Sequence, residues 1–470
     1  MPTPSLRVLI ECDSHEYLIK LALMRLGEDS GDISSSFDDY LRRSSFGKFD
    51  WLHLDRFFAI PLELHPKEAK RFLVRGLIEV KEPDTIPVFI DNEAAGGPAR
   101  VFSDPLIGAY RMKGLNRPVG DTARVREQLQ TQMLNDKGLD GSGVAIAIVD
   151  SGIYLPRLTR QLGFEPALDE TNSWKPDRVA TQPGMHRLGH GTMCAYDALI
   201  AAPKATLIDV PMLIDRPPGD HIVSATLSAA MDAYQHLINK WVIGPRPNYK
   251  ALVVSNSWGI FNPGLDDFPP EHEGRFIDNP NHAFRTRFIQ RLTAAGVDIV
   301  FCGSNCGPEC TSPACLSQTS KMIMGANVYP EVLTVGGCDT DNDVIGYSSR
   351  GPARPMFTPA EVQQRPELER KPDISAYTHF LGSKTRRNYL PDTGVSAACP
   401  VAAGCIAALR TKVSPAPAET PPDALFSLIK QTARGGNDAG PGGVWNEKFG
   451  HGIIDPVAAA RTLGLIPMEA

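Results

Sequence analysis

The stretch from Leu390 to Leu409 constrains the fold more than any other part of the sequence. It reads LPDTGVSAACPVAAGCIAAL, so a turn of Thr, Gly and Ser leads directly into a run of Ala, Gly and Cys. Side chains this small let a helix pack against a sheet with very little clearance. The sequence therefore predicts a buried helix with Ser396 in its first turn, where unpaired backbone N–H groups and the helix dipole favour negative charge.

A serine hydroxyl becomes a useful nucleophile only when a base removes its proton and a third group orients that base. Asp150 ends an apolar run in GSGVAIAIVDSGI, which predicts a buried strand, and His190 lies at a glycine-flanked helix start in LGHGTMCAYDALI. The chain order Asp, His, Ser is one of three known for this triad. We therefore expect Asp150 to orient His190 and His190 to activate Ser396.

These motifs resemble those of the subtilisin-like serine proteases (subtilases, peptidase S8 family), which read approximately D-[ST]-G, G-H-G-T and G-T-S-M-A-x-P. The chain has Asp-Ser-Gly at 150–152 and Gly-His-Gly-Thr at 189–192, and its third motif, Gly-Val-Ser-Ala-Ala-Cys-Pro at 394–400, differs at three positions. The resemblance implies a serine endopeptidase that hydrolyses peptide bonds through an acyl-enzyme intermediate.

Short apolar segments alternate with helical patterns between residues 122 and 470, which predicts an α/β fold with a doubly wound, mostly parallel sheet. We interpret 122–470 as a subtilisin-like catalytic domain. Strands are expected at 144–149, 206–212, 251–256 and 298–302, and helices at 189–201, 223–240 and 284–295.

Residues 1–93 are expected to form a small α/β domain of ferredoxin-like type, followed by a linker at 94–121 that is rich in Gly, Pro and Ala. Its pattern predicts strands at 6–11, 52–64 and 78–90 and a helix at 65–75 that Pro66 opens. The end of this domain resembles a subtilase prodomain, which implies an intramolecular inhibitor and self-cleavage in the linker. An accessory domain without that role fits the same pattern.

The resemblance also implies residues that handle the substrate. Asn305, which follows a predicted strand in VFCGSN, matches the asparagine that stabilises the oxyanion; a turn-forming role is the alternative. Ser257, Trp258 and Gly259 in SNSWG match the segment that pairs with the substrate backbone as an added strand. Trp258 fits a core position equally well.

Cysteines cluster unusually at 302, 306, 310 and 315, while the chain has nine in total. Their spacing does not match the paired C-x2-C pattern typical of zinc sites, so metal binding, a local disulfide and reduced thiols all remain open, with reduced thiols as the default. Cys194 and Cys399 lie one helical turn from His190 and Ser396, and we expect them to be buried and inert rather than reactive.

Composition excludes several other functions. The net charge of −6 and the lack of a basic run argue against nucleic acid as a partner, and no apolar run is long enough for a membrane helix. The first residues show no secretory signal pattern, so we expect a cytoplasmic protein. The predicted reaction requires no cofactor. Subtilases often bind calcium, but Asp339, Asp341 and Asp343 lack the distal Glu of a calcium loop, and no position can be assigned.

Two other functions fit the same sequence. One is a catalytically silent subtilase-like domain that only binds peptides, although every required side chain is present. The other is a specialised maturation protease or transpeptidase that acts on one partner peptide. In each case we expect the partner to be a protein or a peptide.

Overall fold

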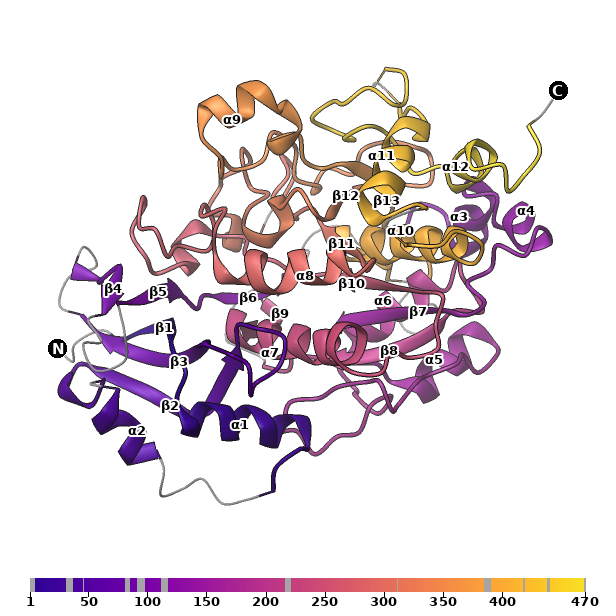
Figure 1. Cartoon of the computed structure of the whole chain (residues 1–470). Coiled ribbons are helices and arrows are strands. Elements are labelled where there is room, and N and C mark those ends of the chain that lie inside the picture. Colours follow the sequence, from indigo (N-terminus) through magenta and orange to yellow (C-terminus); the bar gives the residue numbers. More distant parts are fainter. Residues whose placement is uncertain are drawn as a thin grey trace. The chain divides into compact units, whose positions relative to one another are not determined.

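The computed structural model describes residues 5–30, 37–44, 46–80, 85–90, 98–110, 117–215, 221–310, 312–383, 390–416, 419–437 and 440–468. The chain forms two compact units, whose elements are labelled in Figure 1. Unit 1 comprises Met1–Leu106, Thr226–Arg246 and Pro263–Phe288, and unit 2 comprises Ile107–Ala225, Pro247–Asn262 and Ile289–Ala470. The units therefore alternate along the chain and differ from the consecutive domains that the sequence predicts. No helix in the described ranges has the length and apolar character needed to cross a membrane.

Unit 1 contains a five-stranded antiparallel sheet with the strand order β2-β3-β1-β5-β4. The strands are β1 (Ser5–Asp13), β2 (Leu52–Pro61), β3 (Arg71–Glu79), β4 (Phe89–Ile90) and β5 (Ala99–Ser103), and the helices α1 (Glu16–Leu26), α2 (Phe37–Arg43) and η1 (Phe46–Lys48) lie between β1 and β2 in the sequence. The expected small α/β domain is therefore present. Part of the predicted linker is a strand, because β5 pairs with β1 and β4.

The helix predicted at 65–75 is wrong. Residues 65–70 form turns, and Arg71 begins β3. The carboxylate of Glu63 accepts the backbone N–H groups of Lys70 and Arg71, which holds the chain in a turn at this point. β3 then pairs with both β1 and β2, and the hydrogen bonds and burial of a central strand outweigh the helical propensity of the sequence.

Later parts of the chain complete unit 1. α7 (Leu227–Ile238) begins after the strand β9 (His221–Thr226), so the helix predicted from 223 begins four residues later than expected. Ser228, in the first turn of α7, donates its backbone N–H and its hydroxyl to the carboxylate of Asp104, and Asp232 forms an ion pair with Arg25 at 2.7 Å. The π-helical η3 (Asn239–Ile243) follows, and the predicted helix at 284–295 is divided between η5 (Phe284–Ile289) and α8 (Gln290–Ala294).

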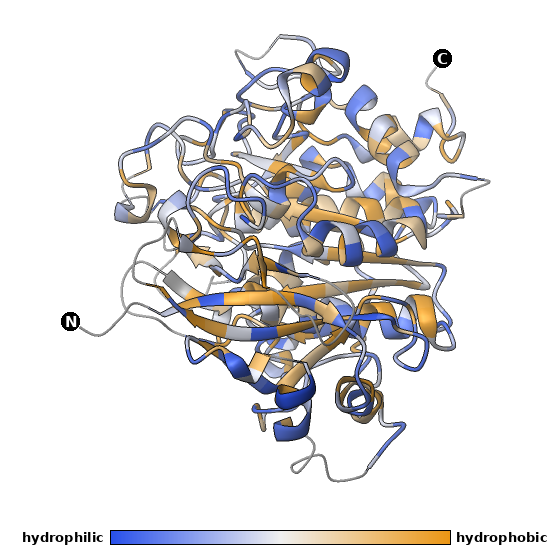
Figure 2. Ribbon diagram, turned by 60° about the vertical axis from the view of Figure 1, so that its left-hand side comes forward, coloured by the Kyte–Doolittle hydropathy of each residue, from blue (hydrophilic) through white to orange (hydrophobic). Residues whose placement is uncertain are grey.

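Unit 2 contains the expected parallel sheet, with six strands in the order β13-β12-β11-β10-β7-β8. Its strands are mostly apolar, and Figure 2 colours them accordingly. Both faces of such strands are buried, because helices cover a parallel sheet on its two sides. The strands are β7 (Val144–Asp150), β8 (Thr206–Pro211), β10 (Ala251–Asn256), β11 (Asp298–Cys302), β12 (Leu333–Cys338) and β13 (Ile374–Tyr377).

Unit 2 also contains several helices and most of a small second sheet. β6 (Leu106–Tyr110) and β9 form the second sheet. The helices besides α8 are α3 (Thr122–Gln128), α4 (Thr131–Asp136), α5 (Leu155–Leu162), α6 (Gly189–Ala198), α9 (Pro359–Gln364), α10 (Val395–Arg410), α11 (Pro422–Thr432) and α12 (Pro456–Thr462). Short helical turns are η4 (Pro263–Leu265, in unit 1), η6 (Pro313–Cys315), η7 (Gly325–Val328) and η8 (Pro366–Leu368).

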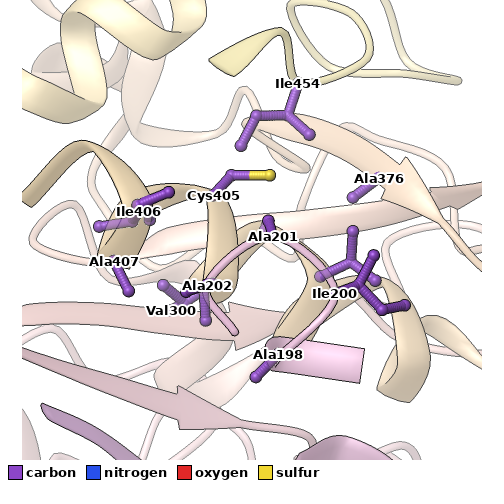
Figure 3. Packing of buried hydrophobic residues seen from close by; sticks show 14 of the residues in the cluster. Ala198, Ile200, Ala201, Ala202, Val300, Ala376, Cys405, Ile406, Ala407 and Ile454 are labelled. Atoms are coloured by element: carbon purple, nitrogen blue, oxygen red, sulfur yellow. The ribbon is translucent and has the colours of Figure 1, made fainter. Parts of the chain in front are cut away.

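The small-residue helix expected at the centre of the fold is α10, which is buried along its whole length. A Cβ atom at Gly404 would lie 2.1 Å from the carbonyl oxygen of Ala198 in α6, so only glycine permits this close approach. Figure 3 shows the small side chains of both segments packed together. At its C-terminal end, Arg410 forms a fully buried, two-pronged ion pair with Asp298 at the start of β11. The helix that carries Ser396 is therefore fixed firmly to the sheet.

Candidate active site

The first half of the candidate site lies where β7 ends and α6 begins. The carboxylate of Asp150 approaches Nδ1 of His190 with both oxygens, at 2.8 and 2.9 Å, and both side chains are buried. The backbone N–H of Ser151 donates to the same carboxylate at 2.6 Å. A carboxylate at Nδ1 keeps the proton on that nitrogen, so the lone pair of Nε2 is left to accept a proton.

Glycines in the two sequence motifs bring Asp150 and His190 together. Gly152 has a φ of +88°, and a Cβ atom there would lie 2.5 Å from the Cβ of His186. A Cβ atom at Gly191 would lie 2.6 Å from the carbonyl oxygen of Gly152, and the N–H of Gly191 donates to the hydroxyl of Ser151. The two motifs therefore touch through their backbones, which no larger residue would allow.

The second half of the site is the start of α10. Ser396 is the second residue of this helix, and its hydroxyl donates to the carbonyl oxygen of Ser257 at 3.5 Å. The sulfur of Cys194 lies 3.5 Å from the carbonyl oxygen of Ser396 and 3.9 Å from Nδ1 of His190, so one thiol touches both halves. In this rotamer the hydroxyl bonds to Ser257 rather than to His190. The hydrogen bond between Ser396 and His190 stays a prediction.

Asn305 contacts the residue that precedes Ser396. Its amide oxygen accepts the backbone N–H of Val395 at 2.8 Å, and the side chain is buried. The amide nitrogen lies near Gly394, where it would be 3.2 Å from an added Cβ atom. The backbone N–H of Ser396 is in the first turn of α10, where no intrahelical acceptor is present. The role of Asn305 as an oxyanion donor stays a prediction.

The segment predicted to bind substrate follows β10. The side chain of Trp258 is fully buried, donates from Nε1 to Asn256 and packs edge-to-face on Phe301 at 5.0 Å between ring centroids. The side chain of Trp258 therefore occupies the core position that the sequence left open, and the pairing of this segment's backbone with substrate stays a prediction. Ser257 donates its hydroxyl to the carbonyl oxygen of Ser396 at 2.9 Å.

The backbone of Gly259 is paired with another part of unit 2. Its N–H donates to the carbonyl oxygen of Gly108 at 3.1 Å, and the N–H of Gly108 donates back at 3.0 Å. Gly108 belongs to β6, within the region that the sequence predicted to be a linker. The edge expected to receive a substrate strand therefore carries a strand of the protein itself.

Sequence reasoning missed Asn327, which joins two walls of the site. Its amide nitrogen donates to the carbonyl oxygen of Trp258 at 3.1 Å and to that of Cys302 at 2.7 Å. One side chain thus connects the substrate segment to the strand that leads to Asn305. No motif predicts this role, because an Asn in GANVYP is typical of an ordinary turn.

Asp209 was also missed, although a carboxylate within the apolar run TLIDVP is a detectable signal. It is buried in β8 and accepts the backbone N–H of Ile153 at 3.1 Å and that of Gly184 at 2.8 Å. These residues lie in the chain segments that follow Asp150 and precede His190. Burial, with a smaller contribution from the negative charge of Asp150, raises the pKa of Asp209 to about 7.

The cysteine cluster contains a disulfide between Cys306 and Cys315. The default of reduced thiols is therefore wrong for these two residues. Cys302 does not join them, because its sulfur lies against the carbonyl oxygen of Trp258. Burial raises the pKa of Cys194 well above its usual value and that of Cys399 to about 12, which agrees with inert thiols.

Within the described ranges, two groups of side chains lie close enough together to hold a metal ion. One consists of Cys306, Cys310 and Cys315, and the other of Asp150, His190 and Cys194. The acidic run at 339–343 is in neither group. Instead, Asp339 accepts the backbone N–H groups of Asp341 and Asp343, which closes a turn.

Comparison with known proteins supports the same assignment. Residues 141–452 match the model of the subtilase family. The chain is 26% identical over 351 residues to serine protease AprX of Bacillus subtilis, an alignment that covers 67% of each protein. It is 27% identical over 349 residues to the human membrane-bound transcription factor site-1 protease and 23% identical over 288 residues to furin-1 of Xenopus laevis. These alignments cover 74% and 60% of this chain but only 28% and 32% of the two relatives.

Proposed function

The chain belongs to the subtilase family, and from this premise we propose that it is a serine endopeptidase. The contact of Asp150 with Nδ1 of His190, next to Ser396 at the start of a buried helix, is the observation that carries the proposal. It supplies an oriented base beside a hydroxyl that lies where negative charge is favoured.

In the proposed reaction, the hydroxyl of Ser396 turns from Ser257 towards Nε2 of His190, which takes its proton as the oxygen attacks the substrate carbonyl. The NH₂ group of Asn305 and the backbone N–H of Ser396 stabilise the oxyanion. His190 then protonates the leaving amine, Asp150 stabilises the imidazolium, and water releases the acyl group from Ser396. The roles in this proposal are filled by groups of the protein and by water, so the proposed reaction calls for no metal or cofactor. Calcium binding stays an expectation from the resemblance.

We further propose that a substrate pairs with Gly259 as an added strand, in the manner of Gly108. Two mutual backbone hydrogen bonds join these glycines, so β6 excludes another strand from the same edge. On this proposal the N-terminal residues, including β6, are an intramolecular inhibitor. They restrain the activity until the chain is cut after β6. The cut would fall between 110 and 117, within the predicted linker.

The direct test is to treat the wild type and Ser396→Ala with a fluorophosphonate probe and with a peptide library. We expect the probe to label the wild type at Ser396, the library to be cleaved, and the variant to do neither. A wild type that neither labels nor cleaves would contradict the proposal and favour a domain that only binds peptides. Cleavage of a single narrow sequence would favour a maturation protease, and ligated products would favour a transpeptidase.

Intact mass measured on the same two proteins tests the inhibitor role. We expect the wild type to lose an N-terminal fragment that ends between 110 and 117, and Ser396→Ala to keep its full mass. Equal, full-length masses for both would count against self-cleavage without affecting the proposal of peptidase activity.

A further inference from the structure

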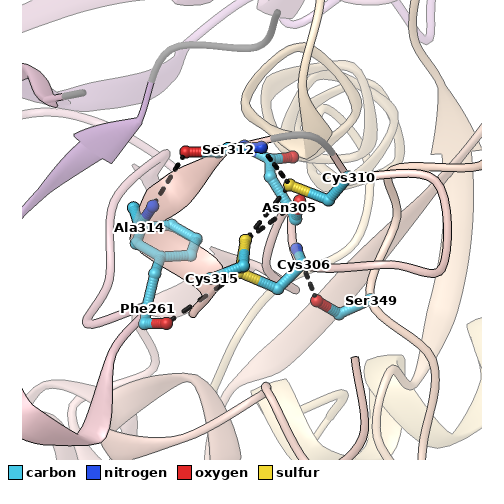
Figure 4. The surroundings of a disulfide bond; sticks show 8 residues. All are labelled: Phe261, Asn305, Cys306, Cys310, Ser312, Ala314, Cys315 and Ser349. Atoms are coloured by element: carbon cyan, nitrogen blue, oxygen red, sulfur yellow. Dashed lines mark hydrogen bonds between the residues drawn. A yellow bond between two sulfur atoms is a disulfide. The ribbon is translucent and has the colours of Figure 1, made fainter. Parts of the chain in front are cut away.

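A third cysteine lies next to the disulfide that follows Asn305. The sulfur of Cys310 is 3.1 Å from the sulfur of Cys315, closer than the roughly 3.5 to 4.0 Å at which non-bonded carbon atoms pack. Figure 4 shows the three sulfurs grouped together, with Asn305 beside them. The arrangement joins a thiol and a disulfide within one short loop.

Two features favour Cys310 as an attacking group. The backbone N–H of Ser312 donates to its sulfur at 3.4 Å, which stabilises the thiolate, the form that attacks a disulfide. Cys310 is also partly exposed to solvent, whereas Cys306 and Cys315 are buried. A base or a small thiol in solution can therefore reach Cys310 more readily than the disulfide itself.

We propose that Cys306, Cys310 and Cys315 form a thiol–disulfide exchange site that controls the position of Asn305. The thiol of Cys310 loses its proton to solvent, and the thiolate attacks the sulfur of Cys315. A bond between Cys310 and Cys315 forms as the bond between Cys306 and Cys315 breaks, and Cys306 leaves as a thiolate that takes up a proton. One disulfide and one thiol exist before and after, so the step consumes no oxidant or reductant.

The exchange acts on Asn305 because Cys306 is the next residue. In the observed state, the disulfide ties Cys306 to Cys315, while the backbone N–H of Cys306 donates to the hydroxyl of Ser349 at 3.0 Å. After exchange only hydrogen bonds hold this residue. Asn305 would then keep its bond to Val395 but lose the covalent restraint on the loop that follows it. This consequence rests on the proposed role of Asn305 as an oxyanion donor.

The loop also contacts the segment that leads to the nucleophile. The N–H of Gly307 donates to the carbonyl oxygen of Tyr347 at 2.8 Å, and the hydroxyl of Tyr347 accepts the N–H of Gly394 at 3.0 Å. A change at Cys306 can therefore reach both Asn305 and the residues just before Ser396. We expect the exchanged form to turn over substrate about tenfold more slowly, short of the roughly 10² to 10³ lost with a complete oxyanion donor.

The first test maps the disulfides of the full-length protein in the absence of substrate. Wild type, Cys310→Ser and Cys306→Ser are incubated at mildly alkaline pH with a mixture of reduced and oxidised glutathione, then alkylated and analysed by peptide mass spectrometry. The oxidised form supplies the oxidant for the disulfide that Cys306→Ser must form from two thiols. We expect both the 306–315 and the 310–315 disulfides in the wild type, only 306–315 in Cys310→Ser, and only 310–315 in Cys306→Ser. Wild type with the 306–315 disulfide alone would overturn the proposal, as would zinc bound to three reduced cysteines.

The second test measures turnover and the rate of fluorophosphonate labelling of the same proteins, with melting temperatures to confirm that each is folded. The kcat of Cys310→Ser should equal that of untreated wild type and should not change when glutathione is added. The kcat of Cys306→Ser should be about tenfold lower. Equal kcat values for the two folded variants would overturn control of Asn305. If no variant labels or cleaves, the proposed peptidase function fails, and the disulfide map alone decides whether exchange occurs.

Discussion

The two halves of the candidate site are held in different ways. Around Asp150 and His190, glycines that no other residue could replace let the backbones of the two motifs touch, and the carboxylate of Asp209 accepts backbone N–H groups on both sides. Around Ser396 and Asn305, side chains from distant segments make them, through Ser257, Asn327 and a disulfide. The comparison indicates that the first half depends mainly on two glycine motifs that pack backbone to backbone, whereas the second half depends on single side chains and one disulfide.

The largest expected effect comes from the first half. Asp150→Asn keeps the shape of the side chain but presents an amide to Nδ1 of His190, which no longer fixes the required tautomer. We expect kcat to fall by about 10⁴ with little change in KM. Turnover with a fluorogenic peptide and the melting temperature check this result. If kcat fell less than tenfold in a folded protein, His190 would not need the carboxylate. The first half of the site would then be no more sensitive than the second.

In the second half, Asn305→Ala should lower kcat by about 10² to 10³, because one oxyanion donor is lost. Asn305→Asp is the matched control, since its carboxylate can still accept the N–H of Val395 but cannot donate to an oxyanion. Both variants should therefore lose kcat, with KM largely unchanged. If Asn305→Asp retained full kcat, the residue would serve only to hold Val395 in place.

Asn327 tests the comparison further, because it supports the second half through hydrogen bonds to Trp258 and Cys302 rather than to Ser396. Asn327→Asp removes both donated hydrogen bonds while preserving side-chain shape, and it leaves the carbonyl oxygens of Trp258 and Cys302 without this donor. A typical hydrogen bond contributes about 0.5 to 1.5 kcal/mol to stability, and two are lost here, so we expect a lower melting temperature together with a higher KM. An unchanged melting temperature and KM would show that the brace is dispensable.

The smallest expected effect on turnover comes from Asp209 in the first half, where we expect a pH dependence of stability and no direct effect on the chemistry. Its folded-state pKa of about 7 is above its ordinary value of 3.8, so between these pH values the folded protein keeps a proton that the unfolded chain has lost. This group therefore makes the free energy of unfolding fall as pH rises through that window and level off above about 7. The amide of Asp209→Asn does not titrate.

Urea unfolding of wild type and Asp209→Asn at several pH values checks this result. The stability of the wild type relative to the variant should decrease as the pH rises from about 4 to 7. A difference that stays constant over this range would show that Asp209 has an ordinary pKa. Asp209 would then support the Asp150 and His190 pair only through the hydrogen bonds that it accepts from Ile153 and Gly184.

The sequence predicted the parallel sheet and the buried helix of Ser396 well, because both depend on local patterns. Apolar runs such as VAIAIV and small residues such as those around Gly404 allow few other structures. The helix at 65–75 was mispredicted because pairing with two neighbouring strands, which a single segment does not reveal, determined its structure. The same reason explains why Trp258 could not be placed before its partners Asn256 and Phe301 were known.

The sequence by itself determined the family, since an acid, an imidazole and a hydroxyl occur in this order, each beside glycine in a short motif. The same motifs contain the glycines that bring Asp150 and His190 together. Only the tertiary structure decided how the other half is held. Asn327, the strand of Gly108 on Gly259 and the choice of Cys315 as the partner of Cys306 all depend on segments that meet in space but have no fixed spacing in the chain. Hydrogen bonds and disulfides act over a few ångströms, so no pattern along the sequence could reveal them.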